Sequence, residues 1–506
     1  MDTGVGSYSI KDTIFADDNA ILALLYILES GKQEFFFALY PNDKCIMRAT
    51  ISRLLDSRYQ LDFVIPEAFS DKINVDDFFC KPAVLVIPSP TGGNVPNINI
   101  FISQNDVESV SLAIAENAPR KAKVIIKAFR ADYDDNKWVN SKQTALFRFN
   151  PQDFNPNHNR GVIYDITTNI NQQHPFKNAV KIEIGKTIYI FYHEIISKDL
   201  GFFIIKSPNL VRHEDFVNIV DSIRSAYALL NGYYIADNIF YVSMQPGKID
   251  SLTFKYQSLN NTINSKKPLI DFHRYKNLED EEFLLSSKHF ENLVRLLYNN
   301  IELRRACILI TQAGCLENIS KGGLASVALE TITSYFMSKE TNKVRKLIED
   351  TSIASQLLYE LKKAIKTIKD KVDKGTWDKL SSKVGKFNEI PNSTKLSNPF
   401  ISLGINLSAE EEFCLNCRNQ FLHGSIPKPK EDIYNYLTQE ELQSLVSNRL
   451  CMLSAMLMLK KAGYNGLVVD WGATEIVYKR EIAKGHGTKH LSFQHRNLSM
   501  QENDKE

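Results

Sequence analysis

Residues 408–424 read SAEEEFCLNCRNQFLHG and predict a helix with both ends marked. Ser408 with Glu411 three positions later is a capping box, which starts helices, and Gly424 suits the left-handed residue that ends them. The apolar residues lie on more than one face, as in a helix buried between other helices or at a subunit interface. They are Phe413, Cys414, Leu415, Cys417, Phe421 and Leu422. We therefore expect a helix from Ala409 to His423 that solvent barely reaches.

The sequence around this stretch has helical periodicity from Asp280 onward. Thr438 and Glu441 form a second capping box, and Gly463 supplies a further stop. The predicted helices span about 280–298, 301–313, 323–338, 343–370, 409–423 and 438–462, with an Asn-, Ser- and Pro-rich linker at 384–408. These segments predict an all-α bundle over 280–464.

The first 270 residues instead show short runs rich in β-branched and aromatic residues, bounded by Pro, Gly and Asn clusters. Such runs are 34–40, 83–87, 98–102 and 188–192. One helix interrupts them at 216–230 and ends at Gly232. The fold class predicted is therefore α+β. A β-rich domain at 1–270, sandwich or barrel-like and of one or two subdomains, precedes the bundle. Residues 465–506 are predicted as one strand at 467–469 and a flexible polar tail.

Composition restricts the class of protein. A chain of 506 residues is too long for one core, and 43% hydrophobic with 24% charged residues is ordinary globular composition. The net charge of +2 means that any nucleic-acid surface must be local. Residues 1–6 lack the features of a secretory signal, and the longest apolar stretch, 450–459, is short of the ~20 residues of a membrane span. We expect a cytoplasmic protein without membrane contact.

Arg418, Asn419 and His423 carry the chemistry of the helix. A buried arginine needs an anion, either a carboxylate or a substrate phosphate. A guanidinium can clamp phosphate oxygens and stabilise a charged transition state, and an imidazole can act as general acid or base. Asn419 would position either partner. One histidine cannot act as both acid and base at once, so a homodimer is expected, with neither metal nor cofactor.

The order Arg418-Asn419, three variable residues and His423 at the end of a bundle helix resembles the HEPN superfamily. A β-rich part before such a bundle resembles the ApeA-like antiphage defence proteins. The resemblance covers roughly 280–464. It implies a metal-independent endoribonuclease that acts as a dimer, is often toxic to its own cell on activation, and cleaves RNA, with tRNA as a candidate. It also implies that the N-terminal part senses a trigger, such as a phage product, or restrains the enzyme.

Other residues have a functional and a plain interpretation. Glu330 could pair with Arg418 or orient His423, although a helix-surface glutamate is the favoured interpretation. Residues 343–386 carry six more basic than acidic residues, so Lys362, Lys363, Lys366 and Lys369 are candidates for RNA binding, with a solvated helix equally compatible. Cys414 and Cys417 are predicted to be core residues, because a structural zinc site would require a second pair of ligands.

The alternative function is a non-catalytic adaptor. In that case the helical domain dimerises and the β-rich domain binds a protein or glycan ligand. No ligand motif is identifiable in residues 1–270, so the sequence does not name the trigger.

Overall fold

The computed structural model describes residues 33–38, 46–54, 58–65, 83–87, 98–113, 120–130, 138–149, 179–198, 200–235, 238–244, 253–259, 263–270, 285–339, 347–348, 350–388, 392–429, 434–485 and 493–498. The chain divides into two compact units. The strand unit comprises Met1–Arg224, Tyr234–Ile263 and Ser286–Arg295, and the helical unit comprises Ser225–Tyr233, Asn264–Leu285 and Leu296–Glu506. The division passes within α3 (His213–Asn231) and α5 (Ser287–Tyr298), and within the short strands β13 (Tyr233–Tyr234) and β16 (Ile263–Asn264).

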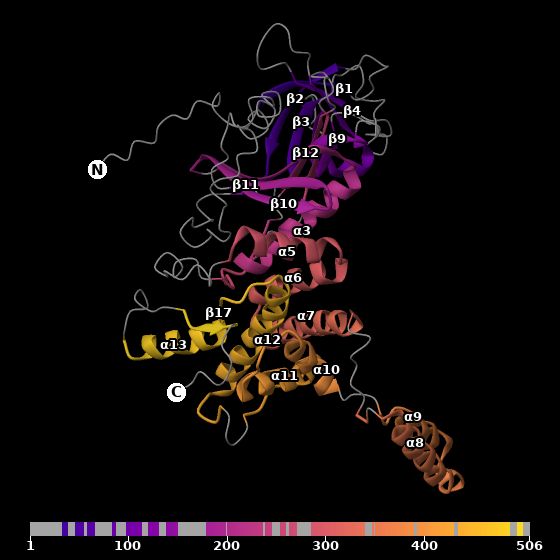
Figure 1. Cartoon of the computed structure of the whole chain (residues 1–506). Helices are drawn as coiled ribbons and strands as arrows, with labels where there is room; N and C mark the ends of the chain where they lie inside the picture. Colours follow the sequence, from indigo (N-terminus) through magenta and orange to yellow (C-terminus); the bar gives the residue numbers. More distant parts are fainter. Residues whose placement is uncertain are drawn as a thin grey trace. The chain divides into compact units, whose positions relative to one another are not determined.

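The strand unit is built on one ladder of fourteen antiparallel strands in the order β10-β11-β12-β9-β14-β15-β8-β5-β4-β1-β2-β3-β7-β6. Its strands are β1 (Gln33–Ala38), β2 (Ile46–Arg53), β3 (Tyr59–Val64), β4 (Ala83–Ile87), β5 (Ile98–Ile102), β6 (Val107–Ala113), β7 (Lys121–Ile126), β8 (Ala128–Arg130), β9 (Ser141–Phe149), β10 (Val180–Ile184), β11 (Thr187–Ser197), β12 (Leu200–Val211), β14 (Asn238–Met244) and β15 (Thr253–Ser258). Figure 1 labels several of these strands. The runs at 83–87, 98–102 and 188–192 fall on strands of this ladder, and so do residues 34–38 of the first run. Residues 39–40 lie outside the described residues.

The ladder curls back on itself. Strand β7 runs into β8 with only Lys127 between them, although the two lie far apart in the strand order. Tyr59 on β3 contacts Phe129 on β8 and Tyr256 on β15, with ring centroids 5.7 and 5.1 Å apart. Strands distant in the ladder therefore pack face to face, which is compatible with both the sandwich and the barrel-like option. A twisted sheet this wide has to curl to bury its apolar face.

Helix α3 supplies further core to the strand unit. Phe216 is fully buried and contacts Tyr189 of β11 and Tyr241 of β14, with ring centroids 6.4 and 6.3 Å apart. The helix ends before Gly232, whose φ of +66° is left-handed. The predicted helix and its stop are both confirmed. In α5, Phe290 stacks on Phe191 of β11 at 6.0 Å.

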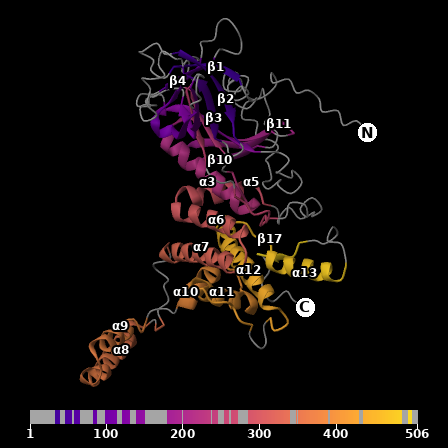
Figure 2. The same cartoon turned by 180° about the vertical axis from the view of Figure 1, so that it is seen from behind.

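In the helical unit, α7 (Asn318–Lys339) is the central element. It packs against α6 (Ile301–Gly314), α10 (Asn392–Ser402), α11 (Ala409–Leu422) and α12 (Gln439–Lys461), and both views show these helices around it (Figure 2). Helix α12 is long and apolar enough to cross a membrane, yet most of it is buried inside the structure, as in the core helix of a soluble protein. Both predicted capping boxes are present, at the starts of α11 and α12.

The structure corrects the prediction after residue 340. The supposed linker at 384–408 contains α10, in which Leu396 and Phe400 are buried. Burial of these apolar residues outweighs the Asn, Ser and Pro content that predicted a loop. The helix predicted at 343–370 is α8 (Thr351–Lys366), and α9 (Lys374–Gly385) follows it after a short 3-10 turn, Lys369–Lys371. Residues 340–346 lie outside the described residues.

The C-terminal segment contains more structure than the strand and flexible tail that were predicted. The strand is confirmed as β17 (Leu467–Val469), but α13 (Trp471–Ala483) follows it, and β18 (His495–Asn497) pairs with β17. Asp470 starts α13 by accepting a hydrogen bond from the backbone N–H of Ala473 at 3.0 Å. A single pairing between residues thirty positions apart leaves no local signal in the sequence.

Candidate functional site

The helix that carries the candidate motif has the ends that the sequence predicts. The side chain of Glu411 accepts a hydrogen bond from the backbone N–H of Ser408 at 2.9 Å, and the Ser408 hydroxyl accepts one from Glu411 at 3.2 Å. At the other end, Gly424 has a φ of +68°, and Ser425 N–H donates to the carbonyl of Gln420 at 2.7 Å. This is the Schellman arrangement, which satisfies the last carbonyls of the helix. The capping box and the Schellman arrangement therefore determine where the helix that carries the motif begins and ends.

Arg418 is buried, at 6% exposure, and has the anionic partner that its burial requires. Its Nη2 lies 3.1 Å from Oε1 of Glu330 on α7 and donates to Oδ1 of Asn419 at 2.8 Å. Its Nε is also buried and has no hydrogen-bond partner among the described residues. Since buried donors are nearly always satisfied, an unpartnered N–H on this guanidinium is unusual.

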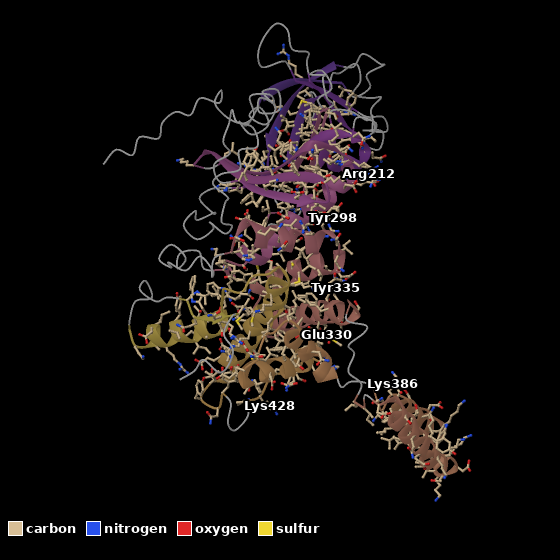
Figure 3. All side chains as sticks on the ribbon, in the orientation of Figure 1. Arg212, Tyr298, Glu330, Tyr335, Lys386 and Lys428 are labelled. Atoms are coloured by element: carbon tan, nitrogen blue, oxygen red, sulfur yellow. The ribbon has the colours of Figure 1, made fainter. Side chains whose placement is uncertain are left out.

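Glu330 is therefore a partner of Arg418 and not only a helix-surface residue. The interpretation favoured from the sequence, a surface glutamate without a role at the motif, was wrong because Glu330 pairs with Arg418. The Glu330 side chain is nevertheless 43% exposed, as that of a surface residue would be. Figure 3 shows Glu330 on α7. Because it reaches Arg418 from the solvent side, water screens the pair, and we expect it to contribute little to stability.

Asn419 and His423 do not share the burial of Arg418, and this corrects the prediction that solvent barely reaches them. Both are exposed. They lie four positions apart and so occupy one face of α11, with His423 as the C-cap residue and not the last helical residue. The buried side of α11 is formed by Phe413, Cys414, Leu415, Cys417, Arg418 and Phe421.

Close packing of α7 against α11 holds the motif in place. A Cβ added to Gly322 would lie 2.4 Å from Cδ1 of Phe421, so only glycine allows this approach. One turn further along α7, the hydroxyl of Ser326 lies 3.4 Å from the carbonyl oxygen of Arg418 and donates to that of Gly322 at 2.6 Å. Sequence reasoning missed both residues, although small residues on an apolar helix are the usual sign of close helix packing.

Replacing Gly322 with alanine should destabilise the helical unit by about 1–3 kcal/mol, because the new methyl group overpacks the Phe421 ring. The neighbouring Gly323 is the matched control, since a Cβ there meets nothing within 4 Å. Gly323→Ala should stabilise the protein by about 0.5–1 kcal/mol through helix propensity. Urea unfolding of both variants checks this; equal effects at the two positions would contradict the close approach.

A second polar cluster, which the sequence did not reveal, lies in the helical unit near the start of α7. Lys321 is only 5% exposed, and its Nζ lies 3.4 Å from Oδ1 of Asn448 on α12. Lys267 forms an ion pair with Glu475 of α13. Glu475 also accepts hydrogen bonds from Ser444 at 2.7 Å and from Asn448 at 3.0 Å. Both ammonium groups thus contact Asn448, and Lys267 pairs with the carboxylate of Glu475.

Burial, followed by the charge of Lys267, lowers the pKa of Lys321 to about 8, and Glu475 only partly opposes this. Between this pKa and the unfolded value near 10.4 the unfolded state binds more protons, so stability rises with pH in that window. Lys321→Met should therefore be more stable than the wild type at pH 7, by about 1–3 kcal/mol, and the difference should shrink toward pH 10. Thermal unfolding at both pH values tests this. A less stable variant at pH 7 would contradict it.

The four lysines predicted to bind RNA lie on exposed positions of α8 and of the turn that follows it. None of the nine lysines between residues 351 and 386 forms an ion pair with a described residue. Asp350 and Asp373, which could neutralise some of them, instead accept backbone hydrogen bonds at the starts of α8 and α9. Only Ala354 is buried in α8, and no residue is buried in α9. The helix pair therefore presents unneutralised positive charge.

The cysteines beside the motif are core residues, as predicted. Cys414 and Cys417 are both buried, and burial raises the pKa of the Cys414 thiol. In the described part of the chain, no three His, Cys, Asp or Glu side chains are grouped so that they could hold a metal ion. Comparisons of the chain with protein-family models, with curated proteins and with solved structures found no match.

Proposed function

We propose that the protein is a HEPN-type, metal-independent endoribonuclease whose catalytic residues are Arg418, Asn419 and His423. The observation that carries the proposal is that an exposed His423 and a buried, anchored Arg418 lie at the same end of α11. Asn419 joins the two, since its side chain accepts a hydrogen bond from Arg418 and shares the exposed face of His423. A substrate phosphate could then meet both groups.

The reaction is transfer of the phosphoryl group to the neighbouring ribose hydroxyl. A general base takes the proton of the 2′-hydroxyl, and the 2′-oxygen forms a bond to phosphorus. The bond from phosphorus to the 5′-oxygen breaks, and a general acid protonates that oxygen. Arg418 stabilises the extra negative charge on the phosphorane oxygens. The products are a 2′,3′-cyclic phosphate and a 5′-hydroxyl.

A homodimer completes the site in this proposal, because His423 supplies a single imidazole. Leu422 and Ile426 support it, since both are exposed, at 37% and 41%, on either side of His423 in the sequence. Apolar side chains at a polar site are expected where a second copy covers them. Two His423 side chains across a twofold axis would provide one acid and one base for a shared phosphate.

The proposed function is tested by incubating the purified full chain with total tRNA in the presence of EDTA. We expect cleavage that resists the chelator and leaves 2′,3′-cyclic phosphate and 5′-hydroxyl ends. Because enzymes of this class can be held inactive, the assay is repeated with a phage lysate as activator. Absence of cleavage under both conditions would favour the alternative below. The wider role in antiphage defence rests on the resemblance.

The second candidate is the non-catalytic adaptor, in which the helical unit dimerises and the strand unit binds a protein or glycan. The ion pair between Arg418 and Glu330 favours it, because a carboxylate already meets the charge of the guanidinium. The unpartnered Nε of Arg418 and the exposed His423 favour the enzyme, since an adaptor needs neither.

The unneutralised lysines of α8 should contribute to RNA binding. Replacing Lys362 and Lys366 with glutamine should weaken tRNA binding and lower the slope of log affinity against log salt by about 1.4–1.8, the value for two phosphate contacts. The matched control replaces Lys479 and Lys484, whose charges are paired with Glu440 and Glu481. Fluorescence anisotropy across a salt series measures both pairs, and equal slopes would show that the α8 lysines are merely solvated.

A further inference from the structure

The outward face of four strands of the strand unit carries a hollow of about 610 Å³. It lies over β2, β3, β7 and β6, which are neighbours at one end of the ladder. The same strands bury Ala49, Phe63 and Ala122 on their opposite face. This part of the sheet therefore has one buried face and one face exposed to solvent. A solvated sheet face is usually flat or convex and offers no enclosed volume. This one is lined by Arg48, Thr50, Asp62, Val64, Ser111, Lys121 and Lys123, among others.

The strand register places these side chains in two rows. In one row Asp62 pairs with Thr50 on one side and with Lys123 on the other, and Lys123 pairs with Ser111. In the next row Val64 pairs with Lys121, and Arg48 lies one residue beyond the Ala49–Phe63 pair. Adjacent strands are about 4.8 Å apart, so Arg48 and Lys121 flank the hollow across roughly 10 Å. Long cationic side chains at that separation can reach one common anion.

The charges in the hollow are not balanced. Arg48, Lys121 and Lys123 face a single carboxylate, Asp62. None of the three cations forms an ion pair with any residue in the described ranges, although Asp62 lies directly across from Lys123. The side chain of Asp62 instead accepts a hydrogen bond from Nε2 of Gln60 at 2.7 Å.

Some surface cations elsewhere in the strand unit have ion-pair partners. Arg58 pairs with Glu108 at 2.5 Å, and Arg212 pairs with Asp215 at 2.8 Å. The cations of the hollow differ from these two arginines because they form no ion pair with a described residue and lie together in a concave site. Three cations beside one carboxylate leave an excess of positive charge, and a bound anion would relieve the repulsion between the cations.

We propose that this hollow binds a nucleotide, a phosphate-bearing small molecule, independently of the ribonuclease activity. Guanidinium and ammonium groups are the usual partners of phosphate oxygens, and the hydroxyl of Thr50 can add a further hydrogen bond. Asp62 accepts hydrogen bonds but repels phosphate, so it faces a donor group such as a ribose hydroxyl or a base amino group. Val64, 43% exposed, gives the apolar contact that a base or sugar needs.

The size of the hollow favours a small molecule over a polymer. Ligand pockets for small molecules typically enclose about 300–1,000 Å³, and this hollow falls in that range. A polynucleotide surface would instead need a charged track that extends along the chain, with stacked aromatic rings. The described lining contains one aromatic residue, Phe63, and it is buried on the other face.

The test is calorimetric titration of the full chain with ATP, inorganic triphosphate and adenosine. We expect saturable binding of ATP to the wild type. Lys121→Gln with Lys123→Gln should weaken it by at least about tenfold, since two charge-assisted contacts are lost. The matched control, Lys181→Gln with Lys186→Gln, changes the same charge at another edge of the ladder and should leave the affinity within about twofold.

A third variant, Asp62→Asn, separates a nucleotide from a free phosphate compound. It should weaken ATP but strengthen inorganic triphosphate, because the carboxylate accepts from the nucleoside and repels the phosphates. The proposal is overturned if neither ATP nor triphosphate binds the wild type, or if the paired lysine variant binds as well as the control. It is also overturned if only an RNA oligonucleotide binds there. The readout is binding alone, so failure of the nuclease assay would leave it unaffected.

Discussion

Replacing His423 with alanine is expected to lower the rate of RNA cleavage by about 10²- to 10⁴-fold, the usual contribution of a general acid or base. The loss should appear in kcat, because the imidazole acts on protons that move only in the transition state. RNA binding should be retained, since Arg418 and the lysines of α8 remain. Rates from single-turnover cleavage of a labelled tRNA, with affinity measured in parallel, separate the two quantities.

The fold should survive this substitution. His423 is exposed, and its contribution to the end of α11 is a backbone N–H that donates to the carbonyls of Asn419 and Gln420. Alanine keeps that N–H, so the free energy of unfolding should change by less than about 1 kcal/mol. A variant that unfolds would show a structural histidine. If a folded variant cleaves at the wild-type rate, either His423 takes no part in the mechanism or a contaminating nuclease is responsible for the cleavage.

The dimer in the proposal can be tested with the same variant. Mixed dimers of one wild-type and one His423→Ala subunit can be isolated through two different affinity tags. If the two histidines act as acid and base on one phosphate, the mixed dimer should be almost as inactive as the double variant. If each copy carries a complete site, it should retain about half of the wild-type activity. The second result would rule out the shared site while leaving the enzyme intact.

The fold could be predicted where local chemistry decides it. Capping boxes at Ser408 and Thr438, and the positive φ at Gly232, Gly424 and Gly463, follow from a few adjacent residues, and all five are confirmed. The strand runs are similarly local. The order of the fourteen strands could not be predicted, because it depends on pairings such as that of Phe101 on β5 with Arg130 on β8, which local patterns do not encode.

Elements held by tertiary burial were missed. Helix α10 contains Pro399 and little helix-favouring sequence, and it forms because Leu396 and Phe400 bury their side chains. Propensity was the wrong guide there, since packing routinely overrides it. The same holds for the cluster of Lys267, Lys321 and Glu475, whose members lie on separate segments. No pattern in one segment signals that the others will join it.

The candidate site was predicted in part. Burying a charge is costly, so a buried Arg418 was predicted to have an anionic partner. Glu330 is that partner. The exposure of Asn419 and His423 could not be predicted, because α11 is apolar on several faces and hydrophobicity does not show which face a neighbour covers. The exposure of His423 is compatible with a catalytic role, since an exposed imidazole can reach RNA and a buried one could not.

Arg418 and Glu330 together distinguish the enzyme from the adaptor. Arg418→Ala is expected to lower the cleavage rate by about 10²- to 10³-fold, as loss of a donor to a charged transition state does elsewhere. The cost to folding should be modest, because the carboxylate left behind is 43% exposed and water can solvate it. Some stability will be lost with the packing of the arginine stem. Urea unfolding and single-turnover cleavage measure the two effects separately.

Glu330→Gln is the matched substitution, since it removes the charge of the partner and keeps its shape. In the enzyme, Glu330 competes with the substrate phosphate for Nη2 of Arg418, so its neutralisation should leave cleavage intact and lower KM by a few-fold. In the adaptor, the ion pair has only a structural role. Arg418→Ala and Glu330→Gln should then weaken folding or dimerisation to a similar degree. A loss of cleavage in Glu330→Gln as deep as that in Arg418→Ala would contradict the competition. It would show that the carboxylate positions the guanidinium for catalysis.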